Sequence, residues 1–195
     1  MQDKPWHQNH IFWQKPILET PRLLLRPFER QDVEAIFGYA CKEEVARYVS
    51  WNVHKSIDDS LVFLENTLSS YHTSLLPNWA IVLCETNCLI GSIGLHNHVP
   101  KNRSIEIGYV IDSLYWNKGY VTEAVQKILE ICFLDLELNR VAAIYEPDNI
   151  GSGRVMEKVG MLYEGYLREY FIEEGIAKDV KLYAILKSDW QKQRQ

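Results

Sequence analysis

Apolar residues recur three or four positions apart in four segments of the chain, as they do along one face of an α-helix. The segments are 30–40, 56–71, about 119–136 and about 150–159. Ser56 followed by Asp59 resembles a capping box at the start of the second segment, and Gly160 directly follows the last one. The pattern therefore predicts four helices.

Strands are predicted in seven further segments: 22–28, 78–85, 88–99, 103–112, 140–145, 162–172 and 178–187. In the segment 103–112, Tyr109 and the isoleucines lie on one face, and Glu106, Gly108 and Val110 lie on the other. The segment 140–145 is continuously apolar, which indicates a strand covered on both faces. "EEG" at 173–175 predicts the turn of a closing hairpin.

These elements follow one another in the order β-α-α-β-β-β-α-β-α-β-β. The order predicts an α/β fold, with a mixed sheet of about six to seven strands, about four flanking helices and at least one strand–helix–strand crossover. We expect one domain over 18–190. An N-terminal arm (1–17) that carries Trp6 and Trp13 would precede it, and a short C-terminal tail (191–195) would follow.

The composition is that of an ordinary globular protein, with 47% hydrophobic and 24% charged residues among 195. The net charge of −5 gives no basic excess, so duplex binding is not expected. No apolar run approaches the ~20 residues of a membrane span, and the polar N-terminus lacks the apolar core of a secretion signal. We expect a cytoplasmic protein with no nucleic-acid or membrane partner.

The chain has four cysteines, Cys41, Cys84, Cys88 and Cys132, which do not form a disulfide framework in a chain of this length. Cys84 and Cys88 are four residues apart, but no second Cys/His pair has the spacing of a zinc site. We therefore expect four reduced, mostly buried thiols and no metal.

"YWNKGYVTEA" (115–124) joins a predicted strand to the helix after it. A helix N-terminus offers unpaired N–H groups and about half a positive charge. Gly119 lets a ligand approach the backbone, Lys118 adds a charge and Thr122 adds a hydroxyl, so the stretch predicts a phosphate or pyrophosphate site. A plain helix start with a solvated lysine is the alternative.

Two common nucleotide motifs do not match the chain. The Walker loop needs an early glycine and a lysine that follows a glycine, whereas Lys118 precedes Gly119. Gly151 and Gly153 open the helix after 140–145, but the third glycine of the dinucleotide fingerprint would stand at Met156.

Asn149, Ser152 and Arg154 lie at this second strand-to-helix joint. If the strands that end near 111 and 145 are parallel neighbours, both helix starts lie on the edge of the sheet where ligands of open α/β sheets bind. One joint would hold a pyrophosphate, and the other would supply polar groups beside it. Turn formation and helix capping are the alternative roles of Asn149 and Ser152.

Taken together, these features resemble the GNAT N-acetyltransferases, in particular the RimJ/RimL type that acetylates protein N-termini. The resemblance is carried by "LETPRLLLRPFERQDVEAIF" (18–37), "IEIGYVID" (105–112), "YWNKGYVTEAVQKILEICF" (115–133) and "NRVAAIYEPDNIGSGRVMEKVGMLYEGYLRE" (139–169), with a similar ending at 178–190. It implies the GNAT fold, a strongly twisted mixed sheet whose central parallel strands splay apart and hold acetyl-CoA.

The resemblance also implies a set of cofactor-binding residues: Tyr109, Val110, Ile111, Lys118, Gly119, Tyr120, Val121, Thr122, Asn149, Ser152 and Arg154. Residues 118–122 would bind the pyrophosphate through backbone N–H groups, and 109–111 would run beside the pantetheine arm. Asn149 would hold the pantetheine part, and Ser152 would lie near the sulfur.

Three positions depart from the family's pattern. Asn117 stands where glycine is common, and Val121 fills a slot usually taken by glycine or alanine. Met156 stands where many members carry a tyrosine that protonates the leaving thiolate. In the RimJ/RimL type a serine is the proposed replacement, and here that serine is Ser152.

An amine attacks a thioester only when neutral, and an α-amine with a pKa of ~7.7–8.0 is partly neutral at physiological pH. Glu106 is the candidate base, acting through a water; a structural carboxylate paired with an arginine is the alternative. A backbone N–H of Val110 or a neighbour would bind the oxyanion. Ser152 would assist the leaving thiol, and Ser152→Ala is expected to lower kcat by about tenfold to a hundredfold.

Trp51 and His96 are the candidates for the acceptor pocket, with a half-buried loop aromatic and a strand-end surface histidine as the alternatives. His98 is expected to point the same way as His96.

The predicted reaction moves an acetyl group from acetyl-CoA to a primary amine by direct attack in a ternary complex. A protein N-terminal α-amine of the ribosomal-protein type is the preferred acceptor. The alternatives are a small amine (polyamine, amino acid or antibiotic-like) and a non-catalytic acyl-CoA-binding sensor. The protein would be a monomer or a homodimer.

Overall fold

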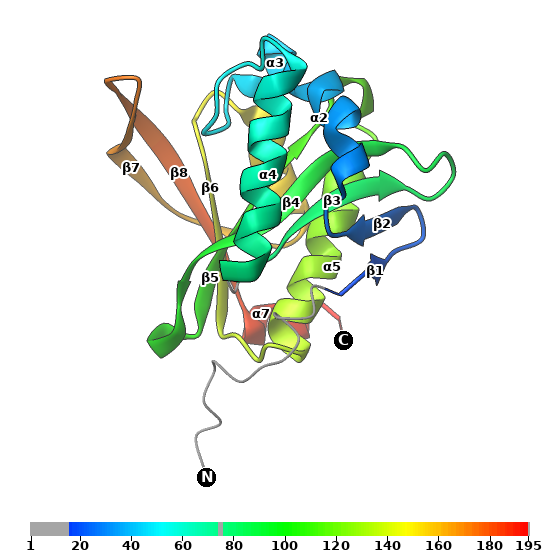
Figure 1. Ribbon diagram of the computed structural model, residues 1–195. Coiled ribbons are helices and arrows are strands. Elements are labelled where there is room, and N and C mark those ends of the chain that lie inside the picture. The colour runs from blue at the N-terminus through cyan, green and yellow to red at the C-terminus, as the bar shows by residue number, and fades with distance from the viewer. Residues whose placement is uncertain (1–15, 74–75, 195) are drawn as a thin grey trace.

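A computed structural model describes residues 16–73 and 76–194, so nearly all of the expected N-terminal arm, with Trp6 and Trp13, lies outside the described residues. One sheet with the strand order β1-β2-β3-β4-β5-β6-β8-β7 forms the centre of the fold (Figure 1). Its strands are β1 (Leu18–Glu19), β2 (Leu23–Arg26), β3 (Asn78–Leu83), β4 (Leu89–Val99), β5 (Ser104–Ile111), β6 (Arg140–Tyr145), β7 (Leu162–Glu173) and β8 (Ile176–Leu186).

Helices lie on both faces of this sheet, with α2 and α4 in front and α5 behind in Figure 1. The α-helices are α2 (Val33–Ala40), α3 (Glu43–Ala46), α4 (Ile57–Thr73), α5 (Tyr120–Leu134), α6 (Ile150–Lys158) and α7 (Lys187–Lys192). The four predicted helices are α2, α4, α5 and α6. At the start of α4, the Asp59 carboxylate accepts the backbone N–H of Ser56 at 3.0 Å, which is one half of the predicted capping box.

The neighbours β5 and β6 are parallel, and the other neighbouring strands pair antiparallel. The parallel register ends at Glu106 opposite Ala142, although β5 continues to Ile111 and β6 to Tyr145. The ends of the two strands therefore separate, as the predicted splay requires. This mixed sheet and the helices on its two faces confirm the expected fold class.

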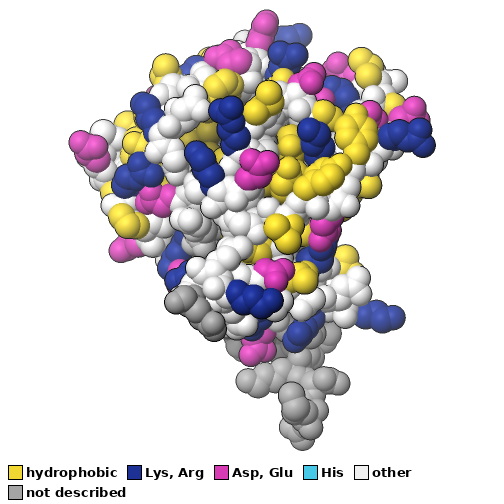
Figure 2. Space-filling view, turned by 180° about the vertical axis from the view of Figure 1, so that it is seen from behind, with side chains coloured by type: hydrophobic (Ala, Val, Ile, Leu, Met, Phe, Trp, Pro, Cys, Tyr) yellow, Lys and Arg dark blue, Asp and Glu magenta, His cyan; other side chains and the backbone are white. Residues whose placement is uncertain are grey.

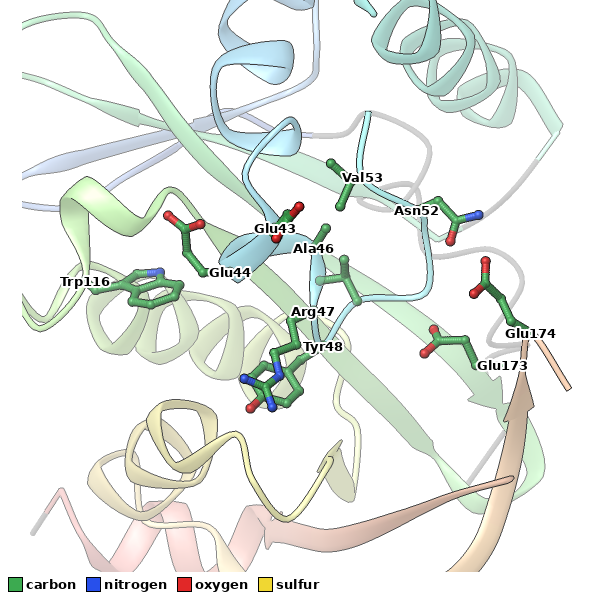
Figure 3. A pocket seen from close by; sticks show the side chains of 11 residues that line it. Glu43, Glu44, Ala46, Arg47, Tyr48, Asn52, Val53, Trp116, Glu173 and Glu174 are labelled. Carbon is green, nitrogen blue, oxygen red and sulfur yellow. The ribbon is translucent and has the colours of Figure 1, made fainter. Parts of the chain in front are cut away.

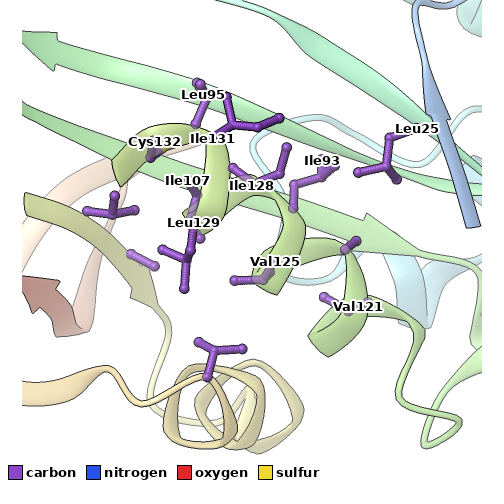
Figure 4. Packing of buried hydrophobic residues seen from close by; sticks show 14 of the residues in the cluster. Leu25, Ile93, Leu95, Ile107, Val121, Val125, Ile128, Leu129, Ile131 and Cys132 are labelled. Carbon is purple, nitrogen blue, oxygen red and sulfur yellow. The ribbon is translucent and has the colours of Figure 1, made fainter. Parts of the chain in front are cut away.

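Two apolar cores hold the helices against the sheet. The larger core packs α5 against the sheet, and Ile93, Ile107 and Ile128 are among its buried members (Figure 4). The smaller core lies on the opposite face, where Ile36 of α2 and Leu64 of α4 are buried. Each fully buried aliphatic side chain contributes about 1.5–3 kcal/mol, so these two cores hold the helices in place on the sheet.

The elements that were not predicted are short. Strand β1 has two residues, α3 has four and α7 has six, so none of them extends over two periods of its pattern. With β1 included, the sheet has eight strands, one more than the upper expectation. Strand β2 ends at Arg26, before the predicted end, because Pro27 has no N–H for the ladder.

The expectation of mostly buried cysteines is wrong. Cys132 is buried on the apolar face of α5, but Cys41, Cys84 and Cys88 are exposed. Cys84 and Cys88 lie in the turn between β3 and β4, and Cys41 follows the last residue of α2. A thiol is small and weakly polar, so residue type alone does not place it in the core.

Charges of both signs are interspersed on the face shown in Figure 2, which carries no continuous stripe of lysine and arginine among the described residues. This distribution agrees with the mild net charge of −5. No described helix is long and apolar enough to cross a membrane. The described residues also contain no group of three or more His, Cys, Asp or Glu side chains arranged to hold a metal ion.

Candidate active site

A cavity of about 590 Å³ lies where the ends of β5 and β6 separate. Both predicted strand-to-helix joints contribute to its wall. Of the eleven predicted cofactor-binding residues, ten line it: Tyr109, Val110, Ile111, Gly119, Tyr120, Val121, Thr122, Asn149, Ser152 and Arg154. The eleventh, Lys118, is not among the lining residues, and its ammonium group lies 5.1 Å from the centre of the Tyr115 ring.

The first joint turns through two left-handed residues, Asn117 with φ 60° and Gly119 with φ 79°. Gly119 is the N-cap of α5, so the N–H groups of the first helical turn are presented at the cavity. Asparagine is one of the few residue types besides glycine that tolerate this region. Asn117, which stands where glycine is common in the family, can therefore adopt the same turn.

Arg22, between β1 and β2, holds this joint and was not among the residues predicted from the sequence. Its Nη1 donates to the carbonyl oxygen of Lys118 at 3.0 Å, and its Nε lies 2.6 Å from Oε2 of Glu123. Thr20 also donates to Glu123, at 2.7 Å. Burial opposes ionisation of Glu123, but the hydrogen bonds from Thr20 and Arg22 outweigh it and lower the pKa of this carboxyl.

The second joint combines a cap with a close approach. Asn149 is the N-cap of α6, and its Oδ1 accepts the Ser152 N–H at 3.2 Å, so the alternative capping role of Asn149 is present. A β-carbon on Gly153 would lie 2.6 Å from the Tyr145 hydroxyl oxygen, so glycine lets α6 pack tightly onto β6. The position of Ser152 is therefore well defined.

A tyrosine links β5 to this second joint. The Tyr109 hydroxyl lies 3.0 Å from Ser152 Oγ and donates to the Ser152 carbonyl oxygen at 3.1 Å. Burial raises the pKa of Tyr109 well above its usual range, although the hydrogen bond with Ser152 counteracts part of this effect. The phenol is therefore neutral at physiological pH.

The antiparallel pairing of β5 with β4 determines the side to which each backbone N–H group of β5 points. Asp112 donates its N–H to Ile90 at 2.8 Å, and because donors alternate along a strand, Val110 also directs its N–H toward β4. Tyr109 and Ile111 direct theirs to the open side. Of the two predicted choices for an oxyanion donor, Val110 or a neighbour, the neighbours are the residues whose N–H groups lie on the open side.

Glu106 lies at the last paired position before β5 and β6 separate. Its Oε2 accepts from Asn97 Nδ2 at 2.9 Å and lies 3.8 Å from His96 Nε2. Burial lowers the pKa of His96 against the opposing charge of Glu106. Asn97 has φ 49° and the pairing with β5 shifts register here, so the strand alternation expected to align His98 with His96 is interrupted.

A second cavity, of about 700 Å³, lies between the segment 43–53 and the turn of the β7–β8 hairpin. Glu173 and Glu174 face it from the hairpin, and Glu43, Glu44 and Arg47 line it from the other side (Figure 3). Four residues line both cavities, so the two adjoin: Glu44, Tyr48, Val49 and Trp116.

Glu106, Trp51 and His96 are not among the described residues that line either cavity. Trp51 packs on the smaller core, with its ring centre 5.1 Å from that of His54. The structure thus brings the predicted cofactor residues together but leaves the predicted acceptor residues apart from these cavities.

Comparison with known proteins agrees with this geometry. Residues 22–162 match the acetyltransferase (GNAT) domain family. The chain is 37% identical to the uncharacterized N-acetyltransferase YoaA of Bacillus subtilis over 172 residues, covering 88% of this chain and 97% of that protein. It is 35% identical over 143 residues to the putative ribosomal N-acetyltransferase YdaF of the same organism, covering 67% and 78%.

A solved GNAT-family acetyltransferase from Bacillus anthracis superposes with a TM-score of 0.79 at 33% identity, covering 89% of this chain and 99% of that one. These similarities confirm the resemblance drawn from the two joints. The chain belongs to the GNAT family and is an acetyl-CoA-dependent N-acetyltransferase.

Proposed function

We propose that this enzyme acetylates the α-amine of a protein N-terminus and binds acetyl-CoA in the cavity between β5 and β6. The observation that carries the proposal is the cavity itself, which joins the open backbone of β5 to the N-termini of α5 and α6. The likeness to a putative ribosomal N-acetyltransferase supports the choice of acceptor.

The residues of the cavity match the chemistry of coenzyme A. The N–H groups at the start of α5 and the positive end of its dipole suit a pyrophosphate. The outward N–H groups of Tyr109 and Ile111 suit the amide groups of a pantetheine arm, which would continue the sheet as a strand does. When bound, acetyl-CoA supplies an activated acetyl group as a thioester.

The acidic second cavity would receive the acceptor. Free amines are largely protonated at neutral pH, and the carboxylates of Glu43, Glu44, Glu173 and Glu174 favour a cationic group near its entrance. Because the two cavities share Glu44, Tyr48, Val49 and Trp116, an amine there lies next to the cofactor cavity. The same carboxylates favour a small polyamine as the second candidate acceptor.

Glu106 would take the proton of the attacking amine through a water. It sits at the apex of the splay, on the face of β5 opposite Tyr109, and its side chain is 20% exposed. Asn97 fixes the carboxylate by its hydrogen bond. Whichever of the Tyr109 and Ile111 N–H groups the pantetheine arm leaves open would stabilise the oxyanion, and Ser152 would donate a hydrogen bond to the departing sulfur.

An acceptor panel tests this proposal. Purified enzyme and acetyl-CoA would be incubated with peptides that have a free N-terminus, with the same peptides blocked at the N-terminus but carrying a lysine, and with spermidine. Mass spectrometry would report the added acetyl group. We expect acetylation of the free N-termini only. Acetylation of spermidine alone would make the second candidate correct, and no acetylation of any amine would refute acetyl transfer to these classes.

A further inference from the structure

We propose that Tyr109 is a positioning residue that aims the Ser152 hydroxyl into the cofactor cavity, where the serine donates a hydrogen bond to the sulfur of coenzyme A. The inference rests on the proposed function, because it takes the cavity as the site of the cofactor's sulfur. It concerns a pair of residues that face each other across the splay, from β5 and from the first turn of α6.

The two contacts determine which hydroxyl group is the donor in each of them. The Ser152 carbonyl oxygen only accepts, so Tyr109 must donate its single proton to close the 3.1 Å contact with it. The 3.0 Å contact with Ser152 Oγ is then filled by the serine proton. This is the first arrangement. In a second arrangement, Tyr109 donates to Ser152 Oγ instead, and the serine O–H turns toward the cavity that both residues line.

This exchange gives Ser152 a replacement partner. When the serine O–H points to a thiolate, the serine oxygen gains a hydrogen bond from Tyr109. The buried Tyr109 hydroxyl then still has a hydrogen-bond partner. No proton changes its covalent bond in this step; only the directions of two O–H groups change. A thiolate therefore favours the second arrangement over the first.

The surroundings keep the pair in place. Ser152 is held by the Asn149 cap at 3.2 Å and by the tight packing of Gly153 on Tyr145. The Tyr109 ring packs against the larger core beside α5. The hydroxyl pair is therefore fixed from both strands, which a serine on a loose helix end would not be.

The main test measures the bound cofactor without turnover. Coenzyme A would be titrated with base on the enzyme, and the thiolate absorbance would be followed after subtracting the cofactor-free protein. We expect the bound thiol of the wild-type enzyme to ionise at lower pH than in Tyr109→Phe and Ser152→Ala. The expected difference is about one pH unit, the effect of roughly one hydrogen bond. Tyr39→Phe is the matched control, because Tyr39 is a buried tyrosine of the smaller core whose hydroxyl bonds a different serine, Ser92, and it lines neither cavity.

Kinetics supply the second readout. Tyr109→Phe should lower kcat about tenfold with little change in the KM of the amine, and the double variant with Ser152→Ala should be no slower than Ser152→Ala alone. Equal thiol ionisation in wild type and Tyr109→Phe would overturn the proposal, as would failure of coenzyme A to bind the wild type. If the wild type acetylates no amine, the proposed function fails, and the thiol titration still decides the role of Tyr109.

Discussion

The backbone at Asn117 determines which residue types the first joint accepts. Its φ of 60° lies in the left-handed region, where a β-carbon costs roughly 1–2 kcal/mol and asparagine is among the tolerated residues. The glycine common in the family and the asparagine of this chain satisfy the same demand. Since the side chain of Asn117 is exposed, the backbone conformation and not side-chain packing restricts the residue types at position 117.

A pair of substitutions at this position separates shape from side-chain chemistry. Asn117→Gly should leave the free energy of unfolding within about 0.5 kcal/mol, whereas Asn117→Val should lower it by about 1–2 kcal/mol. Denaturant unfolding measures both. Asn66→Val, on the exposed side of α4, is the control and should cost less than Asn117→Val. Equal stability of Asn117→Val and wild type would show that the turn is not held at this φ.

His54 gives a pH-dependent contribution to stability. It is buried, its Nδ1 lies 2.7 Å from Ser60 Oγ, and burial lowers its pKa against the opposing effect of Asp59. A histidine with a lowered pKa in the fold stabilises the protein fully above its ordinary pKa of about 6.5. This stabilisation is lost as the pH falls from there toward the folded-state pKa.

We therefore expect the free energy of unfolding to fall between pH 7 and pH 5, and His54→Gln to fall less steeply over this range. Urea unfolding at several pH values gives the pH dependence of the free energy of unfolding for both proteins. The difference between them at pH 8 measures the packing that His54→Gln removes. His96 and His98 also have pKa values lowered by burial, so some slope remains in the variant. Identical slopes in the two proteins would contradict this assignment to His54.

At the scale of elements, the corner between β1 and β2 holds the start of α5 in place. Arg22 contacts both the Lys118 carbonyl and the Glu123 carboxylate, so it ties the two ends of the segment 118–123 together. The Arg22 side chain is 47% exposed, so its ion pair adds little to overall stability. Its effect is expected on the shape of the anion site.

Arg22→Gln should weaken coenzyme A binding by about tenfold and change the free energy of unfolding by less than about 1 kcal/mol. Isothermal titration calorimetry measures the affinity. Glu123→Gln should also weaken binding, and the double variant should bind no more weakly than Arg22→Gln alone, because Arg22→Gln already removes the Arg22–Glu123 contact. Arg30→Gln, an exposed arginine outside the cavity, is the control. An unchanged affinity in Arg22→Gln would exclude the clamp.

The pattern of apolar and polar residues predicted the long elements and the cavity wall, because a strand and the helix after it are formed by neighbouring residues of the sequence. It could not reveal Arg22 with Glu123, which are 101 positions apart, or Tyr109 with Ser152, which are 43 apart. It predicted the face of β5 that carries Glu106 but not its partner Asn97, which depends on a register shift in β4. Such partners are set by tertiary packing.

At the scale of the whole molecule, the splay leaves two unpaired strand edges inside the sheet instead of at its rim. The backbone N–H groups of Tyr109 and Ile111 on β5 therefore face a cavity and not a neighbouring strand. A ligand that fills this gap joins the two halves of the sheet. Binding and folding are linked through it.

Coenzyme A at a hundred times its dissociation constant should raise the free energy of unfolding by about 2.7 kcal/mol. Amide hydrogen exchange read by mass spectrometry should slow most at 109–111, at the start of α5 and at the start of α6. The α2–α4 layer on the opposite face serves as the internal control and should slow least. Slowing that is strongest in that layer would place the ligand elsewhere.

The three exposed cysteines have a practical consequence for every experiment that detects sulfur. Cys41, Cys84 and Cys88 line neither cavity, yet each presents a thiol to solvent. A reagent that counts the thiol of released coenzyme A would also react with these exposed cysteines of the protein. Replacing all three with serine should leave cofactor affinity unchanged. The triple variant, with Cys132 buried as its remaining cysteine, is the suitable background for measuring this enzyme.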